Sequence, residues 1–324
     1  MNDQDFLLLA LKEAHNYAHV TTAVKVGAVI TINDHVCATG FHQGPGTDHA
    51  EVMAIKNANC QLDHATLYVT LEPCNHYGKT PPCTKAILDA GIKKVVYAYK
   101  DFNPDVKGSG AEYLKANGVE VVHQPLDEIN DFYLPYDYGY KHQMPMLELK
   151  QARFAESHII GLPDKRLMIT DDKVEAWAMS KRIEADALMT STQTILIDNP
   201  LFTIRQGNET IKTPPLVICG QTQIPGHYRI HKQDREIIYI QKDLESNLSK
   251  LYQKGYRRIW VECGYKLGHY LHQHKLLKNI YIVESTEPHE SLKSGIKSID
   301  VTSMRPESIE TIGLCDVIRY KISD

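Results

Sequence analysis

The stretch from residue 48 to residue 83 constrains this chain more than any other feature. It begins with the tetrapeptide Asp-His-Ala-Glu at 48–51, continues through an apolar run at Ala65–Thr70, and ends in a Pro- and Gly-bearing loop with Cys74 and Cys83. Zinc in proteins takes nitrogen and sulfur ligands in tetrahedral geometry, and a catalytic zinc leaves one position to water. The stretch therefore offers one imidazole and two thiols for a metal ion, with a carboxylate beside them.

Four side chains in this stretch predict a zinc-dependent hydrolytic deaminase. His49, Cys74 and Cys83 are the expected metal ligands. Glu51 lies two residues after His49 on the first turn of a predicted helix, where it can take a proton from water and return it to a departing amine. Cys83 follows two prolines at the head of the next predicted helix, whose positive end favours the thiolate.

Two alternatives assign these residues to structure alone. In the first, Asp48 and Glu51 form a helix capping box and both cysteines are structural. In the second, the zinc is structural and needs a fourth protein ligand, for which Cys60 or His76 is available.

The pattern of apolar segments predicts two α/β domains. Short apolar strands alternate with amphipathic helices through both halves of the 324 residues, a length suited to two domains, and this alternation favours mainly parallel sheets covered on both faces. The stretch Pro125–Pro145 is rich in Tyr, Asp and Pro without a clear period, and is expected to be a surface linker. The boundary is placed at Met144, giving domains at 1–144 and 145–324.

Charge and cysteine content narrow the class of protein. A formal net charge of -4 disfavours a general nucleic-acid-binding surface, and no apolar run of about 18 residues predicts a membrane span. The seven cysteines are odd in number and mostly isolated within apolar strands, which favours reduced thiols. We therefore expect a cytoplasmic enzyme with a small-molecule substrate.

The motif as a whole resembles a known family. His-Ala-Glu at 49–51, followed by Thr-Leu-Glu-Pro-Cys-Asn-His-Tyr-Gly-Lys-Thr-Pro-Pro-Cys at 70–83, is similar to the bacterial riboflavin-biosynthesis bifunctional deaminase–reductases. Eight residues separate the two cysteines, whereas nucleoside and nucleic-acid deaminases usually have two there. The segment 101–110 also resembles this family. The resemblance implies a cytidine-deaminase-like α/β/α sandwich followed by a dihydrofolate-reductase-like α/β domain, and a homo-oligomer.

For the first domain, the resemblance implies deamination of a phosphoribosylated diaminopyrimidinone with release of ammonia. The positions that match substrate-contacting residues of the family are His42, His76, Lys79, Asp101 and Asn103. One departure is Ala23, where the family usually has an asparagine. A nucleoside or tRNA deaminase, and a binding module with a structural zinc, remain as alternatives.

For the second domain, the resemblance implies NADPH-dependent reduction of the ribosyl group. Arg182, Arg205 and Glu262 match substrate positions. Those that match cofactor positions are Ala152, Thr194, Asp198 and Gly264. The chain departs from the family at Phe154, Ser157 and Met168, so a degenerate domain kept for packing or oligomerisation is the alternative to a working reductase.

Overall fold

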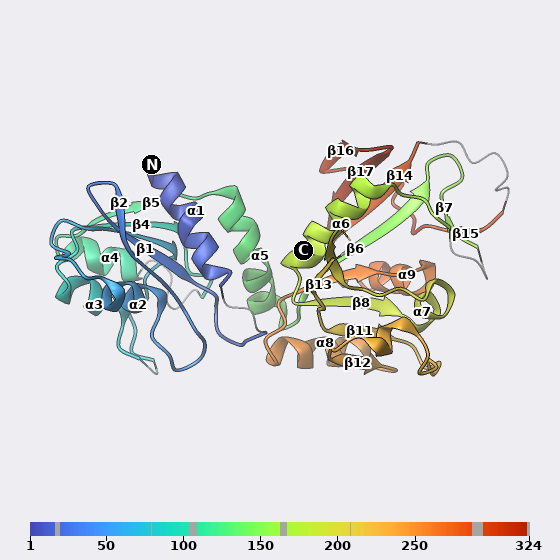
Figure 1. The fold of residues 1–324 in the computed structure, drawn as a ribbon, viewed down its shortest axis with the longest axis horizontal. Helices are drawn as coiled ribbons and strands as arrows, with labels where there is room; N and C mark the ends of the chain where they lie inside the picture. Colours follow the sequence, from blue (N-terminus) through green and yellow to red (C-terminus); the bar gives the residue numbers. More distant parts are fainter. Residues whose placement is uncertain are drawn as a thin grey trace. The chain divides into compact units, whose positions relative to one another are not determined.

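The chain folds into two compact units, and the main boundary between them along the sequence falls between Gln143 and Met144 (Figure 1). The computed structural model describes residues 1–16, 20–78, 80–103, 109–162, 167–207, 209–286 and 294–322. By contacts, Met1–Gln143 and Gln253–Gly255 make up the first unit, and Met144–Tyr252 and Tyr256–Asp324 the second. None of the helices in these ranges combines the length and apolar character that crossing a membrane requires.

The first unit is built on a mixed sheet with strand order β2-β1-β3-β4-β5. Its elements are α1 (Asp3–Ala14), β1 (Gly27–Ile32), β2 (His35–Phe41), α2 (Ala50–Asn57), β3 (Thr66–Leu71), α3 (Cys83–Asp89), β4 (Lys94–Tyr99), α4 (Ser109–Ala116), β5 (Glu120–His123) and α5 (Asp127–His142). Only β3, β4 and β5 run parallel, because β1 pairs with β2 and with β3 in antiparallel register. The expected α/β class is confirmed, with an antiparallel hairpin in place of a mainly parallel sheet.

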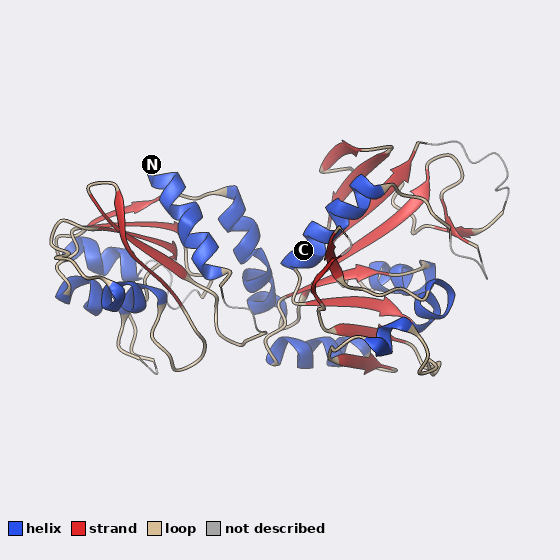
Figure 2. Cartoon of the chain, in the orientation of Figure 1, coloured by secondary structure: helices blue, strands red, loops and turns tan. Residues whose placement is uncertain are grey.

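Helices cover both faces of this sheet (Figure 2). On one face, α2, α3 and α4 bury Ala54, Ile87 and Leu114 against side chains of β1, β3 and β4. On the other face, α1 and α5 pack Phe6 and Tyr133 against the same strands. Alternate residues of each strand point to opposite faces, so the two apolar clusters together form an α/β/α sandwich.

The expected linker at Pro125–Pro145 is wrong, because most of it is the helix α5. The ring of Tyr133 is fully buried, and its hydroxyl donates to Lys25 O at 3.0 Å and lies 2.7 Å from Thr70 Oγ1. Pro135 lies inside the helix, and Gln143 ends it in the left-handed conformation. Burial of one tyrosine-rich face stabilises this helix despite a sequence of weak intrinsic propensity.

Helix α2 approaches the backbone of β2 at Gly40. A Cβ atom on Gly40 would lie 2.4 Å from Ala54 N and 2.5 Å from Ala50 O, closer than van der Waals contact allows. Asn57 Nδ2 also donates to Thr39 O at 2.9 Å. The glycine therefore sets the position of the helix that begins next to His49.

Replacement of Gly40 by Ala is expected to lower the free energy of unfolding by about 2 kcal/mol, because the new methyl must push α2 away from β2. Urea unfolding followed by circular dichroism measures this. Gly226→Ala is the control, because a Cβ there meets nothing within 4 Å. Equal stability of the two variants would contradict the close packing.

The second unit contains a larger sheet with strand order β12-β11-β8-β13-β6-β14-β17-β16. Its elements are β6 (Met146–Phe154), β7 (Ile159–Gly161), α6 (Asp172–Glu184), β8 (Ala187–Ser191), α7 (Thr192–Asp198), β9 (Ile204–Gln206), β10 (Glu209–Lys212), β11 (Leu216–Cys219), η1 (Arg229–Lys232), β12 (Ile237–Ile240), α8 (Leu244–Gln253), β13 (Arg258–Glu262), α9 (Tyr265–Gln273), β14 (Leu277–Ser285), β15 (Ile296–Lys297), β16 (Ser308–Ile312) and β17 (Cys315–Lys321). The strands from β12 to β14 run parallel, and β17 and β16 add an antiparallel edge. Helices α6 and α7 contribute Val174 and Ile195 to a core that includes Trp260.

The expectation that all cysteines are reduced is wrong for one pair. Cys37 on β2 and Cys60 after α2 form a disulfide that links positions 23 residues apart. Spacing along the chain gives no sign of this pair, because the packing of α2 against β2 brings the two residues together. Cys74, Cys83, Cys219, Cys263 and Cys315 are not disulfide-bonded.

Replacement of Cys60 by Ser is expected to lower the melting temperature of the first unit by roughly 5–10 °C without reductant, because the disulfide restricts the unfolded chain. With excess dithiothreitol, variant and wild type should melt together. Scanning calorimetry measures both conditions, and Cys219→Ser is the control that removes a free thiol. A wild-type melting temperature that does not respond to reductant would contradict the stabilising role.

Candidate active site

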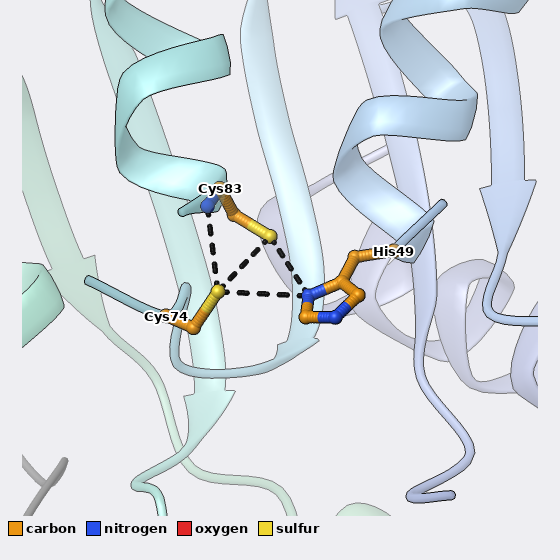
Figure 3. A group of neighbouring side chains, drawn as sticks. All are labelled: His49, Cys74 and Cys83. Carbon is orange, nitrogen blue, oxygen red and sulfur yellow. Dashed lines mark hydrogen bonds between the residues drawn. The ribbon is translucent and has the colours of Figure 1, made fainter. Parts of the chain in front are cut away.

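Three side chains meet where two helices begin in the first unit (Figure 3). His49 precedes α2 in an extended conformation, Cys74 follows β3, and Cys83 is the first residue of α3. His49 Nδ1 lies 3.1 Å from Cys83 Sγ and 3.5 Å from Cys74 Sγ, and the two sulfur atoms are 3.4 Å apart. These atoms converge on one point.

The separations of the three donor atoms fit a zinc ion. Tetrahedral bonds of about 2.3 Å to sulfur and about 2.0 Å to nitrogen place the donors roughly 3.5–3.8 Å apart. The observed spacings are slightly shorter, and one nitrogen with two sulfur atoms is a ligand set that zinc accepts. Among the described residues, no other group of His, Cys, Asp and Glu side chains converges in this way. Three protein ligands leave a fourth position for water or substrate.

Hydrogen bonding and burial shift the pKa values of these groups, and they favour the thiolate at Cys74 only. The expected thiolate-favouring effect at Cys83 is wrong, because its hydrogen bond with Cys74 and its burial raise the pKa of that thiol. Hydrogen bonding with Cys83 lowers the pKa of Cys74 to about 4, and hydrogen bonding to Cys74 raises the pKa of His49 to about 8. Glu51 on α2 is 3% exposed, and its burial raises the pKa of the carboxyl to about 7, with the charge of Cys74 adding to the effect. A carboxyl with this pKa can both accept and return a proton near neutral pH.

A cavity of about 260 Å³ opens beside His49. It is lined by Thr22, Ala23, His42, Pro45, Gly46, Thr47, His49, His76, Gly78 and Thr80. The ring of His42 meets that of His49 edge-on at 5.0 Å, and burial lowers the pKa of His42. The structure thus brings the predicted His42 and His76 together with the metal ligands, and places Ala23 on the wall of the same cavity.

The other predicted substrate residues lie differently. Asp101 follows the carboxyl end of β4 and lines a second cavity of about 510 Å³. Asn103 donates its backbone N–H to Asp101 Oδ1 at 2.9 Å, and its side-chain oxygen accepts from Tyr140 at 3.2 Å. Burial raises the pKa of the Asp101 carboxyl, which also interacts electrostatically with His76. Lys79 lies outside the described residues.

Both structural alternatives for this stretch disagree with the geometry. Helix α2 begins at Ala50, no side chain caps it, and the Asp48 carboxylate pairs with Lys56 at 2.6 Å. Cys60 is bound to Cys37 and is therefore not available as a fourth metal ligand. His76 does not belong to the group of side chains that converge on the metal position.

In the second unit, Arg182 and Glu262 form a bidentate ion pair. Arg182 Nε and Nη2 each donate to a carboxylate oxygen of Glu262 at 2.7 Å, and Trp260 Nε1 donates to the same carboxylate at 2.9 Å. Burial alone would raise the pKa of Glu262, but Arg182 outweighs it and the pKa is lowered to about 2. Lys150 lies close enough to interact with this pair, and burial lowers its pKa.

Two of the predicted cofactor positions, Thr194 and Gly264, meet just beyond the carboxyl ends of the parallel strands β8 and β13. Thr194 on α7 accepts a hydrogen bond at 3.3 Å from the backbone N–H of Gly264, the residue before α9. Ala152 lies on β6 and Asp198 is the last residue of α7. This edge is where open α/β sheets bind ligands, whereas Arg205 lies on β9 and pairs with Glu175.

Several residues that shape the first site escaped the sequence analysis. Thr80 Oγ1 lies 3.4 Å from His49 Nε2, and Thr84 Oγ1 donates to Asn75 Oδ1 at 2.7 Å. The buried Glu72 accepts from Ala111 N at the start of α4. Glu72, Asn75 and Thr80 lie within the segment that carries the cysteines and Thr84 directly follows it, so their place in or next to the motif was the available signal.

Two protein families match the chain. Residues 1–99 match the cytidine and deoxycytidylate deaminase zinc-binding region, and residues 161–284 match the RibD C-terminal domain. The expected fold, a cytidine-deaminase-like domain followed by a dihydrofolate-reductase-like domain, is confirmed.

Relatives resemble the chain over most of its length. The riboflavin biosynthesis protein RibD of Aquifex aeolicus is 31% identical over 91% of this chain and 83% of that protein. RibD of Escherichia coli is 27% identical over 87% of each. A solved RibD structure from Acinetobacter baumannii covers 99% of both chains with a TM-score of 0.79 and 25% identity. A deaminase/reductase structure from Thermotoga maritima covers 98% of both with a TM-score of 0.78 and 26% identity. Together with the metal-ligand geometry, these similarities establish that the chain belongs to the RibD family of riboflavin biosynthesis proteins.

Proposed function

We propose that the first unit hydrolytically deaminates a phosphoribosylated diaminohydroxypyrimidine and that the second unit reduces the ribosyl group of the product with NADPH. The observation that carries the first assignment is the convergence of His49, Cys74 and Cys83 next to the buried Glu51, at the wall of a cavity. The Thermotoga maritima structure with the same two-part fold is described as a diaminohydroxyphosphoribosylaminopyrimidine deaminase and 5-amino-6-(5-phosphoribosylamino)uracil reductase.

Each residue of the first site has a defined task in the proposed deamination. His49, Cys74 and Cys83 hold zinc, which when bound acidifies a water molecule so that it can attack a ring carbon at neutral pH. Glu51 accepts the proton of the attacking water and passes it to the amino nitrogen as the carbon–nitrogen bond breaks. The second hydrogen of the water ends on the neighbouring ring nitrogen, so the ring carbon gains a carbonyl oxygen and ammonia leaves. His42 and His76 orient the pyrimidine from the cavity wall.

In the second unit, we assign Arg182, Arg205 and Glu262 to the substrate side. Ala152, Thr194, Asp198 and Gly264 are assigned to the NADPH side. The contact between Gly264 and Thr194 supports this grouping, because it brings two of these positions together from segments that are 70 residues apart in the chain. Asp101, Asn103 and Lys79 complete the proposed substrate contacts of the first unit. We also propose a cytoplasmic homo-oligomer that does not act on nucleic acid, in keeping with the net charge of -4.

A single assay tests both halves. The purified chain is given the diaminopyrimidine substrate and NADPH, and ammonia and NADPH are followed separately. Release of ammonia followed by oxidation of NADPH is the expected result. Ammonia without NADPH oxidation would contradict a working reductase. Ammonia from cytidine, adenosine or tRNA, but not from the phosphoribosylated substrate, would overturn the substrate assignment.

A further inference from the structure

The two ring nitrogens of His49 face different partners. Nδ1 lies within 3.5 Å of both cysteine sulfur atoms, whereas Nε2 lies 3.4 Å from Thr80 Oγ1. A neutral imidazole has one nitrogen with a free electron pair and one that carries hydrogen. When Nδ1 gives its electron pair to a metal, Nε2 is the nitrogen that carries the hydrogen, and it faces the Thr80 hydroxyl.

We propose that Thr80 is a positioning residue of the metal site, whose hydroxyl oxygen accepts the Nε2–H of His49. This hydrogen bond fixes the tautomer and the plane of the ring, so that the electron pair of Nδ1 is aimed at the metal. Histidines that bind metals almost always donate their second ring nitrogen to an acceptor, usually a carboxylate, a backbone carbonyl or water, and loss of such a partner typically weakens metal binding ten- to a hundredfold. The proposal rests on the proposed function for the identity of the metal as zinc.

The local chain holds Thr80 in place for this contact. Pro81 follows it, and a residue before proline is restricted to extended conformations. The backbone N–H of Gly78 also donates to the carbonyl of Thr80 at 3.3 Å. The hydroxyl is therefore presented by a backbone that has little freedom at this point.

The neighbouring histidine does not take this role. The ring of His42 contacts His49 edge-on, but His42 Nδ1 lies 3.0 Å from Asp48 O and is engaged there. Within the described part of the chain, His49 Nε2 makes its hydrogen-bond contact with the Thr80 hydroxyl. Removal of the Thr80 hydroxyl thus takes away the partner that holds Nε2 of the ring.

Thr80→Val tests this in the full-length chain, because valine keeps the shape of threonine and lacks the hydroxyl. The zinc dissociation constant is measured by competition with a chromophoric chelator, and it should rise ten- to a hundredfold. Thr80→Ser, which keeps the hydroxyl, should restore it to within about threefold of wild type. The visible absorption bands of the cobalt(II)-substituted protein should change in the valine variant and return in the serine variant, because they report ligand geometry.

Thr47→Val is the matched control for zinc affinity. Thr47 lines the same cavity, but its hydroxyl donates to Gly44 O at 2.8 Å and does not contact His49. Wild-type zinc affinity and cobalt bands in Thr80→Val would overturn the proposal, as would equal weakening in Thr47→Val. Thr80→Ala provides a second removal of the hydroxyl if the valine variant does not fold. A wild-type chain that binds zinc but releases no ammonia would refute the proposed function and leave the role of Thr80 standing.

Discussion

Replacement of Glu51 by Gln is expected to reduce ammonia release by about a thousandfold while the chain keeps its zinc. Glutamine has nearly the same shape as glutamate but cannot accept a proton from water, and a positioned acid–base group typically contributes 10²–10⁴-fold. Zinc content stays at one equivalent because Glu51 is not among the converging donor atoms. Initial rates of ammonia formation and metal analysis on the same preparation measure both effects.

Asp48→Asn is the matched control for this variant. Its carboxylate lies three residues before Glu51, but it is directed to Lys56 rather than to the metal position. Ammonia release should therefore stay close to wild type. Full activity in Glu51→Gln would refute the assigned proton transfer, and loss of zinc from that variant would mean that the carboxylate supports the metal.

The pKa of Glu51 also predicts a pH dependence. Burial raises it from 4.5 to about 7, so the base form is present above that pH and is lost below it. Ammonia release should therefore be level above pH 7 and fall about tenfold for each unit below it. The residual rate of Glu51→Gln should lack this step.

Replacement of Glu262 by Gln is expected to destabilise the second unit by about 3 kcal/mol. The change leaves the buried guanidinium of Arg182 without its counter-charge, and breaking a buried ion pair in this way is strongly destabilising. The chain has two tryptophans, Trp177 and Trp260, and both lie in the second unit. Tryptophan fluorescence during urea unfolding therefore reports the unit that contains the substitution.

The matched control is Glu175→Gln, which removes the partner of Arg205 in a more exposed pair. Exposed pairs contribute little, so a cost below about 1 kcal/mol is expected. Ammonia release should survive both substitutions, because the first unit is unchanged. Equal unfolding curves for Glu262→Gln and wild type would contradict the stabilising role of the pair.

The same ion pair predicts how stability depends on pH. In the folded chain the pKa of Glu262 is lowered from 4.5, the value of an ordinary glutamate, to about 2. The stabilisation is therefore complete above pH 4.5 and is lost as the pH falls toward 2, with a size of about 3 kcal/mol. Glu262→Gln should remove this part of the acid sensitivity.

The residues of the metal site were predictable because they lie in one short motif. The three residues His49, Cys74 and Cys83 fall within 35 residues, and their types and order predict a zinc site. The contacts that depend on packing were not predictable. Thr194 and Gly264 meet across 70 residues. The Cys37–Cys60 bond likewise follows from how α2 docks on β2, which apolar periodicity does not reveal.

The helix α5 shows why the expectation of a linker at Pro125–Pro145 is wrong. Its sequence contains Pro135 and many tyrosines, which have weak helix propensity, so no periodic signal appeared. The helix is stabilised by what it covers, since Ile129 and Tyr133 are fully buried. Tertiary contacts of this kind override local preference, and a single sequence does not display them.

Burial of α5 also determines where the chain can be cut. A fragment that stops at Gln124 would contain every metal ligand and Glu51, yet it would expose the apolar surface that α5 covers. Tyr68 and Val96 of the sheet and Phe6 of α1 belong to the same apolar cluster as Tyr133. Such a fragment should aggregate when it is expressed, whereas one that continues through Gln143 keeps the covering helix and its left-handed terminal residue.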